Sequence, residues 1–310
     1  MTIPVSSYDP NDSIPSSNRM FKEDGTMFDI GAAIRAMETS TAFLNALLYD
    51  ADSNLRITNA TDGLAIAKGD VTGTTFVHKF GAAPDFDIAD GFVTVWDGAE
   101  DAVAWELMNY VYSATADIDS ISSSDGGDTQ DVEIQGLDAN YNLVVQTRTL
   151  QGQSRVALST DLIRVFRVKN VGSTNFAGHV FVYVDGTLSG GVPVTNADIR
   201  AVVHPGNNQT EMAVYTIPNG KTGYMRSWYA STAGAKRDSE HTIKILARPL
   251  SGVFQLKHKA NINVAGTSYI QHKYEEPEVF AAKTDIEVQM DTDKDTAGVA
   301  AGFDIVLVDD

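Results

Sequence analysis

The chain has 310 residues, of which 43% are hydrophobic and 21% charged, and its formal net charge at pH 7 is −18. This composition is typical of a soluble globular protein. The acidic excess argues against nucleic acid as a partner, because nucleic-acid binders present a basic surface. The absence of cysteine excludes disulfides, thiol catalysis and thiolate metal sites. No apolar run approaches the roughly 20 residues that span a bilayer, so no membrane partner is expected.

Residues 1–50 predict an N-terminal arm followed by one amphipathic helix. Residues 1–28 contain three prolines and many polar side chains, which favour either an extended arm that lies on a partner or a disordered terminus. From the N-cap residue Asp29 to residue 50, apolar positions recur at alternating steps of four and three, as in three heptads of a coiled coil. The stripe consists of Ile30, Ile34, Met37, Leu44 and Leu48, with Thr41 in its one gap.

Two hypotheses remain open for this stripe. The helix could dock on its own β domain, or it could associate with other copies of the chain and anchor them to a partner. Isoleucine at both Ile30 and Ile34 favours a homotrimer over a dimer. Three heptads with Thr41 in the seam are marginal in isolation, so we expect another surface to contribute to the assembly.

The rest of the chain has the patterns of a mainly β protein. Residues 51–90 predict a β connector with one or two strands, ending in a joint at 81–91 that is rich in alanine and aspartate. Short alternating segments then recur between turn sequences such as Asp185-Gly186. They span residues 92–96, 105–113, 130–135, 143–150, 162–168, 178–184, 199–204, 211–217, 223–231, 241–247, 253–259, 268–273, 285–290 and 303–308.

These segments lack the spacing of βαβ units, so the predicted fold class is an antiparallel β-sandwich, jelly-roll-like, preceded by the arm and the helix. We expect one continuous sandwich over residues 91–310. Two stacked sandwiches that divide near residue 190, in a stretch rich in glycine and proline, are the alternative. Basic residues that alternate with apolar ones, such as Arg164, Arg167 and Lys169, are interpreted as solvent-facing strand positions.

One short motif resembles a phosphate-binding loop without its essential residues. Residues 220–222 (GKT) match the end of such a loop, but Tyr215 stands where the motif needs a glycine. We therefore interpret the segment as a turn between strands. No Gly-x-Ser-x-Gly elbow occurs, and no nucleophile has an identifiable base, so the sequence predicts no enzyme, no catalytic residue and no cofactor.

An acidic run near the C-terminus resembles the opening of a calcium loop. Asp291, Asp293 and Asp295 have the right spacing, but the glycine and the glutamate that such loops require later in the motif are missing. A solvated turn is the favoured interpretation. Calcium bound there, or by Asp125 and Asp128, stays open as the alternative.

Histidines and paired acids give no further site. His78, His179, His258 and His272 are dispersed and fall within strand patterns, so we interpret them as partly exposed strand residues rather than metal ligands. The neighbouring residues 275 and 276, both glutamate, point to opposite faces of a strand and cannot act as a catalytic pair.

Two aromatic clusters allow either a core or a sugar-binding interpretation. They lie at residues 105–112 (WELMNYVY) and 224–229 (YMRSWY). In the second cluster, strand alternation places Tyr224 and Trp228 on one face and Tyr229 on the other. A core strand is the favoured interpretation, and a lectin-like aromatic surface is the alternative.

Five phrases of the sequence carry a family resemblance. They are residues 71–87 (VTGTTFVHKFGAAPDFD), 95–98 (VWDG), 122–142 (SSSDGGDTQDVEIQGLDANYN), 207–231 (NNQTEMAVYTIPNGKTGYMRSWYAS) and 301–310 (AGFDIVLVDD). They resemble virion structural proteins of tailed, marine-type bacteriophages, of the capsid-associated, head-fibre or tail-fibre kind. These phrases contain turns and strands, so the resemblance transfers no functional residue. It implies a trimeric β-sandwich component of a virion.

The functional hypothesis is therefore a phage head-decoration or head-fibre protein that acts in the virion. Its arm and helix, residues 1–50, would attach it to the major capsid protein or another virion protein and join three copies. The alternative is a tail-fibre protein that recognises a glycan on the host surface. Residues 1–50, which the resemblance does not cover, would decide to which part of the virion the chain is attached.

Overall fold

The computed structural model describes residues 19–21, 27–29, 63–100, 103–233, 239–264 and 268–310. The chain divides into two units, residues 1–65 and 66–310. In the first unit, β1 (Arg19–Phe21) and β2 (Met27–Asp29) pair in antiparallel fashion. The predicted heptad helix, with Ile30, Ile34, Met37, Leu44 and Leu48, lies outside the described residues and stays a prediction.

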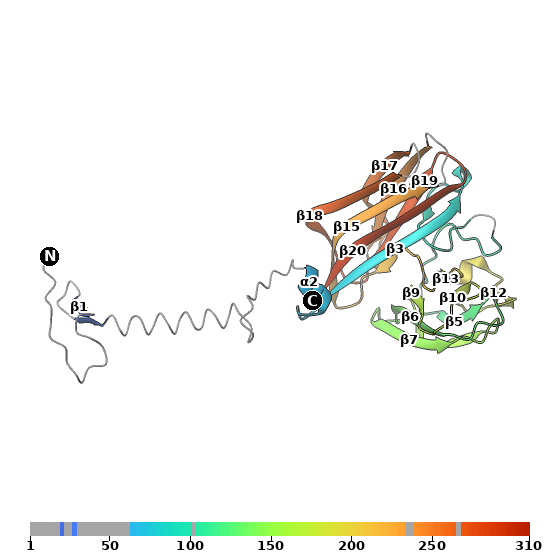
Figure 1. The fold of residues 1–310 in the computed structure, drawn as a ribbon, viewed down its shortest axis with the longest axis horizontal. Coiled ribbons are helices and arrows are strands. Elements are labelled where there is room, and N and C mark those ends of the chain that lie inside the picture. Colours follow the sequence, from blue (N-terminus) through green and yellow to red (C-terminus); the bar gives the residue numbers. More distant parts are fainter. Residues whose placement is uncertain (1–18, 22–26, 30–62, 101–102, 234–238, 265–267) are drawn as a thin grey trace. The chain divides into compact units, whose positions relative to one another are not determined.

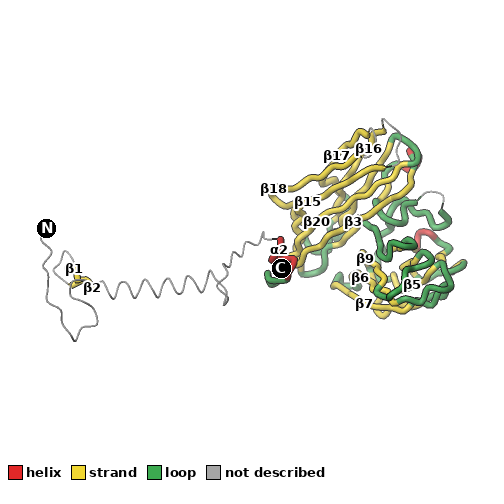
Figure 2. Tube along the Cα trace, viewed as in Figure 1, coloured by secondary structure: helices red, strands yellow, loops and turns green. Residues whose placement is uncertain are grey.

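The second unit is an antiparallel β structure, as the sequence predicts (Figures 1 and 2). Its helical segments are α2 (Gly63–Lys68), which begins in the first unit, η2 (Ile88–Asp90) and η3 (Asn196–Asp198). Its strands are β3 (Thr74–Phe86), β4 (Val93–Thr94), β5 (Ile118–Ser123), β6 (Asp131–Leu137), β7 (Leu143–Thr149), β8 (Val156–Leu162), β9 (Arg164–Asn170), β10 (Val180–Val184), β11 (Leu188–Ser189), β12 (Val192–Pro193), β13 (Ile199–Val203), β14 (Val214–Thr216), β15 (Lys221–Ala233), β16 (Ser239–Arg248), β17 (Gln255–Val264), β18 (Ser268–Phe280), β19 (Asp285–Thr292) and β20 (Ala297–Asp309).

The four main sheets form two sandwiches, and one of them is inserted into the other. The first sandwich takes residues 74–94 and 214–309, with one sheet in the order β18-β15-β20-β3 and another in the order β14-β19-β16-β17, to which β4 adds beside β19. The inserted sandwich takes residues 118–203, with the sheets β13-β10-β5-β8 and β7-β6-β9. The chain therefore leaves the first sandwich after β4 and returns to it at β14.

The long pairing of β3 with β20 joins the two ends of this unit. Thr74 pairs with Val308 at one end and Phe86 pairs with Ala297 at the other, and Figure 1 shows the two strands side by side. Part of the segment that we expected to be a connector is thus a long strand of the first sandwich. Pro84 is tolerated because β3 is the edge strand and its register shifts at that point.

One apolar core runs through both sandwiches. Trp96, Phe181 and Phe303 are fully buried, and they come from the segment between the sandwiches, the inserted sandwich and the first sandwich respectively. The ring of Phe166 in β9 packs edge-on against Tyr215 in β14, with centroids 4.9 Å apart. The two sandwiches therefore bury apolar surface against each other as well as within themselves.

One predicted strand is absent from the structure, and β5 is a strand that the sequence did not predict. Residues 105–113 were expected to form a strand, but their backbone is irregular, and Trp105 and Tyr110 fill the core from this irregular segment. In the sequence of β5, by contrast, polar residues interrupt the apolar alternation that would indicate a strand. Ser122 and Ser123 are buried there, because their hydroxyls donate to the carbonyl of Gly191 at 2.7 Å and to Asp128 at 2.6 Å.

Candidate functional site

The acidic residues that could have bound calcium are engaged within the fold. Asp128 is buried and accepts hydrogen bonds from the backbone amides of Ala177 and Gly178 at 2.9 and 3.0 Å. Asp293 accepts from the amide of Glu240 at 2.7 Å, which ties the turn between β19 and β20 to β16. Within the described part of the chain, no group of three or more histidine and acidic residues has the geometry of a metal site.

The histidines meet in pairs that their dispersed positions do not suggest. The rings of His258 in β17 and His272 in β18 lie 4.6 Å apart, and those of His179 and His204 lie 5.1 Å apart. Burial lowers the pKa of His179 and of His258, and the neighbouring histidine lowers each further. His78 is more exposed and pairs with Asp304 at 2.7 Å.

A β-bulge corrects the expected arrangement of the aromatic segment in β15. The pairing register shifts between Met225 and Ser227, so alternation restarts there. Trp228 is therefore buried on the core face, while Tyr224 stays on the opposite, partly exposed face. The expectation that Tyr224 and Trp228 share a face is wrong, although the assignment of Trp228 to the core is right.

A row of rings crosses the outer face of the sheet that contains β15. Tyr229 stacks with His78 of β3 at a centroid distance of 6.1 Å and with Tyr269 of β18 at 6.3 Å. His78 in turn stacks with Phe80 at 5.8 Å. Gly302 lies beneath Tyr229, since a side chain there would collide with the phenol ring. This aromatic row is the platform that a stacking ligand would need.

A buried ionic junction ties the inserted sandwich to the first one. Asp285 of β19 accepts two hydrogen bonds from Arg164 of β9, at 2.8 and 3.0 Å, and two from Arg248 of β16, at 3.1 and 2.6 Å. Thr216 adds a fifth at 2.6 Å. Arg164 is buried rather than solvent-facing as we expected, because β9 changes register against β6 just beyond it.

The junction borders a hollow of about 320 Å³ with strained backbone around it. Tyr141 and Ser251 line this hollow with φ angles of 66° and 60°, a left-handed conformation that is unfavourable for residues other than glycine. Glu287 lies nearby and accepts from the hydroxyl of Tyr112 at 2.9 Å. Burial raises the pKa of Glu287 to about 7.

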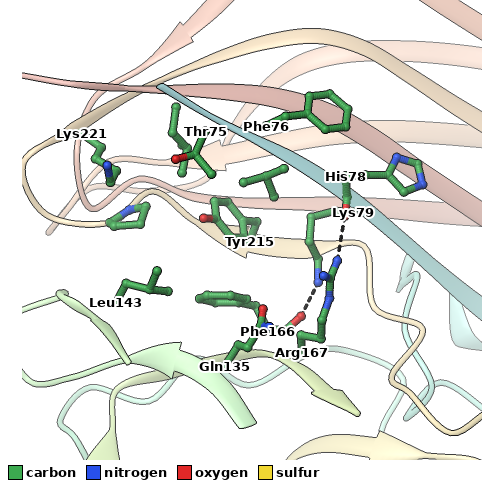
Figure 3. Close-up of a pocket in the computed structure, with 13 residues that line it drawn as sticks. Thr75, Phe76, His78, Lys79, Gln135, Leu143, Phe166, Arg167, Tyr215 and Lys221 are labelled. Carbon is green, nitrogen blue, oxygen red and sulfur yellow. Dashed lines mark hydrogen bonds between the residues drawn. The ribbon is translucent and has the colours of Figure 1, made fainter. Parts of the chain in front are cut away.

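A second hollow, of about 190 Å³, opens between β3 and β9 (Figure 3). The ammonium of Lys79 donates to the carbonyl of Phe166, and the guanidinium of Arg167 donates to the carbonyl of His78 at 3.0 Å. Figure 3 shows the two cationic side chains extending toward each other from opposite walls. The remaining lining mixes apolar side chains, such as Val77, Leu143 and Leu307, with polar ones, among them Gln135 and a third cation, Lys221, and none of the described residues that line the hollow is acidic.

Burial decides the electrostatics of this second hollow. Lys79 is only 3% exposed, and burial lowers its pKa well below the usual range, with Arg167 lowering it further and Asp97 opposing the change. Asp97 is itself buried, which raises its pKa, and it accepts a hydrogen bond from the amide of Glu211 at 2.5 Å. No sequence motif indicates this hollow, because Lys79 and Arg167 stand in ordinary alternating strands.

No family model matches the chain, and no curated protein matches it. Two solved structures that show some similarity come from viruses. The cowpea mosaic virus top component, a naturally occurring empty particle, is 12% identical with a TM-score of 0.21, covering 64% of this chain and 83% of that chain. A structure of the infectious bursal disease virus Gt strain is 10% identical with a TM-score of 0.21, covering 76% and 71%. Scores this low carry no argument about function. Among the described residues, no helix is long and apolar enough to cross a bilayer.

Proposed function

We propose that this chain is a structural protein of a tailed-phage virion, a head-decoration or head-fibre component that displays an acidic β body. The resemblance of residues 71–87, 207–231 and 301–310 to such proteins supports the class. The net charge of −18 suits a body that faces solvent and repels its neighbours. Residues 1–50 would attach it, with a homotrimer and the major capsid protein or another virion protein as its partners.

The observation that carries the display function is that the β unit begins and ends at one pole. The amide of Asp309 donates to the carbonyl of Gly73 at 2.8 Å, just before β3 begins. The amide of Asp310 donates to the carbonyl of Gly220 at 3.1 Å, and Lys221 pairs with Asp309 beside it. A body that the chain enters at one pole can be held there while its remaining surface stays free.

A truncation that removes residues 1–50 tests the attachment. We expect the truncated chain to keep the circular dichroism spectrum and melting transition of the β unit but to be absent from purified virions. A second test uses the full chain carrying Leu44→Asp, which places one charge in the predicted apolar stripe. This variant should fold and be incorporated poorly. Normal incorporation of the truncated chain would refute anchoring by this segment, and immunogold labelling of intact virions would locate the protein on head or tail.

The aromatic row of Phe80, His78, Tyr229 and Tyr269 favours a second candidate, a fibre protein that binds host glycan. Tyr269 is 60% exposed and can be removed without opening the core. In this case Tyr269→Ala should abolish binding on a glycan array. Tyr224→Ala changes a residue of the same sheet outside the row and should leave binding intact. An array without any bound glycan would reject this candidate.

A further inference from the structure

We propose that the hollow between β3 and β9 is a binding site for a carboxylate carried on an apolar body, such as a small aromatic acid. Lys79 and Arg167 would hold the carboxylate, and the apolar walls would enclose the rest. This inference is independent of the virion function proposed above. It rests on three features of the hollow: two cations that contact no carboxylate, a tyrosine hydroxyl that opens into it, and a lining with apolar side chains.

The first feature is a pair of cations without an acidic partner. In the described part of the chain, neither Lys79 nor Arg167 lies within 4.0 Å of a carboxylate oxygen, although Lys169, two residues further along β9, pairs with Glu133 at 2.9 Å. Both cations donate instead to backbone carbonyls. Lys79 is buried and Arg167 partly buried, and a carboxylate placed between their nitrogens would supply the direct ionic contact that both lack.

The second feature is an unused donor. Tyr215 lines the hollow and is only 3% exposed, yet its hydroxyl bonds to none of the described residues. Figure 3 places this hydroxyl inside the hollow, on the side of Thr75 and Lys221. Tyr215 Oη is not among the buried polar atoms that lack a partner, so the hydroxyl opens into the hollow, where it can donate to a polar group of a ligand.

The third feature is the apolar lining, which decides the kind of anion. Val77, Leu143, Phe166, Pro218 and Leu307 supply apolar surface to the hollow, and Leu143 is 53% exposed, a large fraction for such a side chain. At about 30 Å³ per water molecule, the hollow has the volume of about six waters, enough for one ring and its carboxylate. A guanidinium matches a carboxylate geometrically, whereas a phosphate dianion would be poorly solvated between such walls.

The competing interpretation is that Lys79 only fastens β3 to β9 through the carbonyl of Phe166. Titration calorimetry of the full chain with benzoate, acetate and inorganic phosphate separates the two. We expect benzoate to bind about tenfold or more tightly than acetate, because only benzoate buries a ring. Phosphate should bind more weakly than benzoate.

Arg167→Gln is the decisive variant, because Arg167 is only partly buried and its loss leaves the core intact. It should weaken benzoate binding about tenfold or more, the effect of losing one charged hydrogen bond. Lys169→Gln is the matched control, since it removes the same charge from the same strand outside the hollow, and it should change the affinity less than about twofold. Lys79→Met should act like Arg167→Gln; if it fails to fold, Arg167→Gln decides alone.

Three results would overturn the proposal. One is the absence of heat with benzoate at concentrations up to about 10 mM. Another is equal affinity for acetate and benzoate, or tighter binding of phosphate. The last is a benzoate affinity that Arg167→Gln leaves unchanged, which would place any binding elsewhere on the chain.

Discussion

At the scale of single residues, buried charge is the feature that distinguishes this protein. Asp285, Arg164 and Glu287 are each at most 5% exposed, whereas most other charged side chains in the described part of the chain lie at the surface. Asp285 satisfies two guanidinium groups at once, and Glu287 depends on Tyr112 and Gln289 for its hydrogen bonds. A buried ion pair adds little to the free energy of unfolding when both partners are present. Removing one partner lowers that free energy strongly, because the other charge stays buried without a partner.

Asp285→Asn should therefore destabilise the chain strongly. The substitution leaves Arg164 buried without a counter-charge, which costs about 3–5 kcal/mol of the free energy of unfolding. Denaturant unfolding measures the change. The control is Asp70→Asn, which breaks the exposed pair with Lys68, whose side chains are both 62% exposed, and should alter stability by less than about 1 kcal/mol. Equal effects of the two variants would show that the junction does not fasten the sandwiches.

Glu287 should make stability depend on pH in the neutral range. Burial raises its pKa from 4.5 to about 7, so the folded chain binds this proton more tightly than the unfolded chain. The stabilising contribution is complete below pH 4.5 and is lost as the pH rises through 7, a total of about 3 kcal/mol.

Glu287→Gln removes this titration. Between pH 5 and pH 8 the wild type should therefore lose free energy of unfolding that the variant keeps. Unfolding by urea at four pH values measures it. The exposed Glu276→Gln is the control and should track the wild type throughout. A parallel pH dependence for Glu287→Gln and wild type would contradict the prediction.

At the scale of elements, backbone atoms in close contact determine how β3 crosses the segments next to β4 and β14. A side-chain carbon at Gly81 would lie 2.3 Å from the amide nitrogen of Ala213 and 2.4 Å from the carbonyl oxygen of Val95. The amide of the next residue, Ala82, donates to the carbonyl of Glu211 at 3.5 Å. Only glycine allows the three segments to meet, although its φ angle is an ordinary one.

Gly81→Ala should accordingly destabilise the fold by about 3 kcal/mol or more, because the contacting atoms belong to the backbone and cannot rotate away. Gly126→Ala is the matched control, since a side chain there meets nothing within 4 Å. Thermal melting of both variants tests the difference. A melting temperature for Gly81→Ala close to that of Gly126→Ala would mean that the strands separate easily at the crossing.

At the scale of the whole molecule, the nested sandwiches share one core and one ionic junction. The insertion begins and ends between β4 and β14, so neither sandwich is a separate stretch of chain. Contacts between Phe166 and Tyr215, and between Arg164 and Asp285, couple the two. Such coupling predicts that they unfold together.

Two tryptophans can test this cooperativity. Trp105 contacts His179 and Phe181 beside the inserted sandwich, while Trp228 contacts His258 and His272 in the first one. Variants that keep only one of them, with Trp→Phe at the other sites, should show the same urea midpoint by fluorescence. Two separate midpoints would show that the sandwiches are independent folding units.

The sequence by itself determined the class of fold and the position of most strands. Alternation in β6 and turn residues such as Asp185-Gly186 are local signals, and local signals can be read without knowing which strands pair. The amphipathic stripe from Ile30 to Leu48 is of the same kind. The virion function follows from phrases of the sequence and from the pole at which the chain enters the β unit, and it stays a proposal.

The tertiary structure alone decided the nesting of the sandwiches, the buried junction and the cationic hollow. Lys79 and the carbonyl it binds are 87 residues apart, and Arg164 and Asp285 are 121 apart. Alternation predicts two faces for a strand, but it cannot say which partner covers each face, nor where a bulge such as that in β15 exchanges them. Sites built from distant strands therefore appear only once the chain is folded.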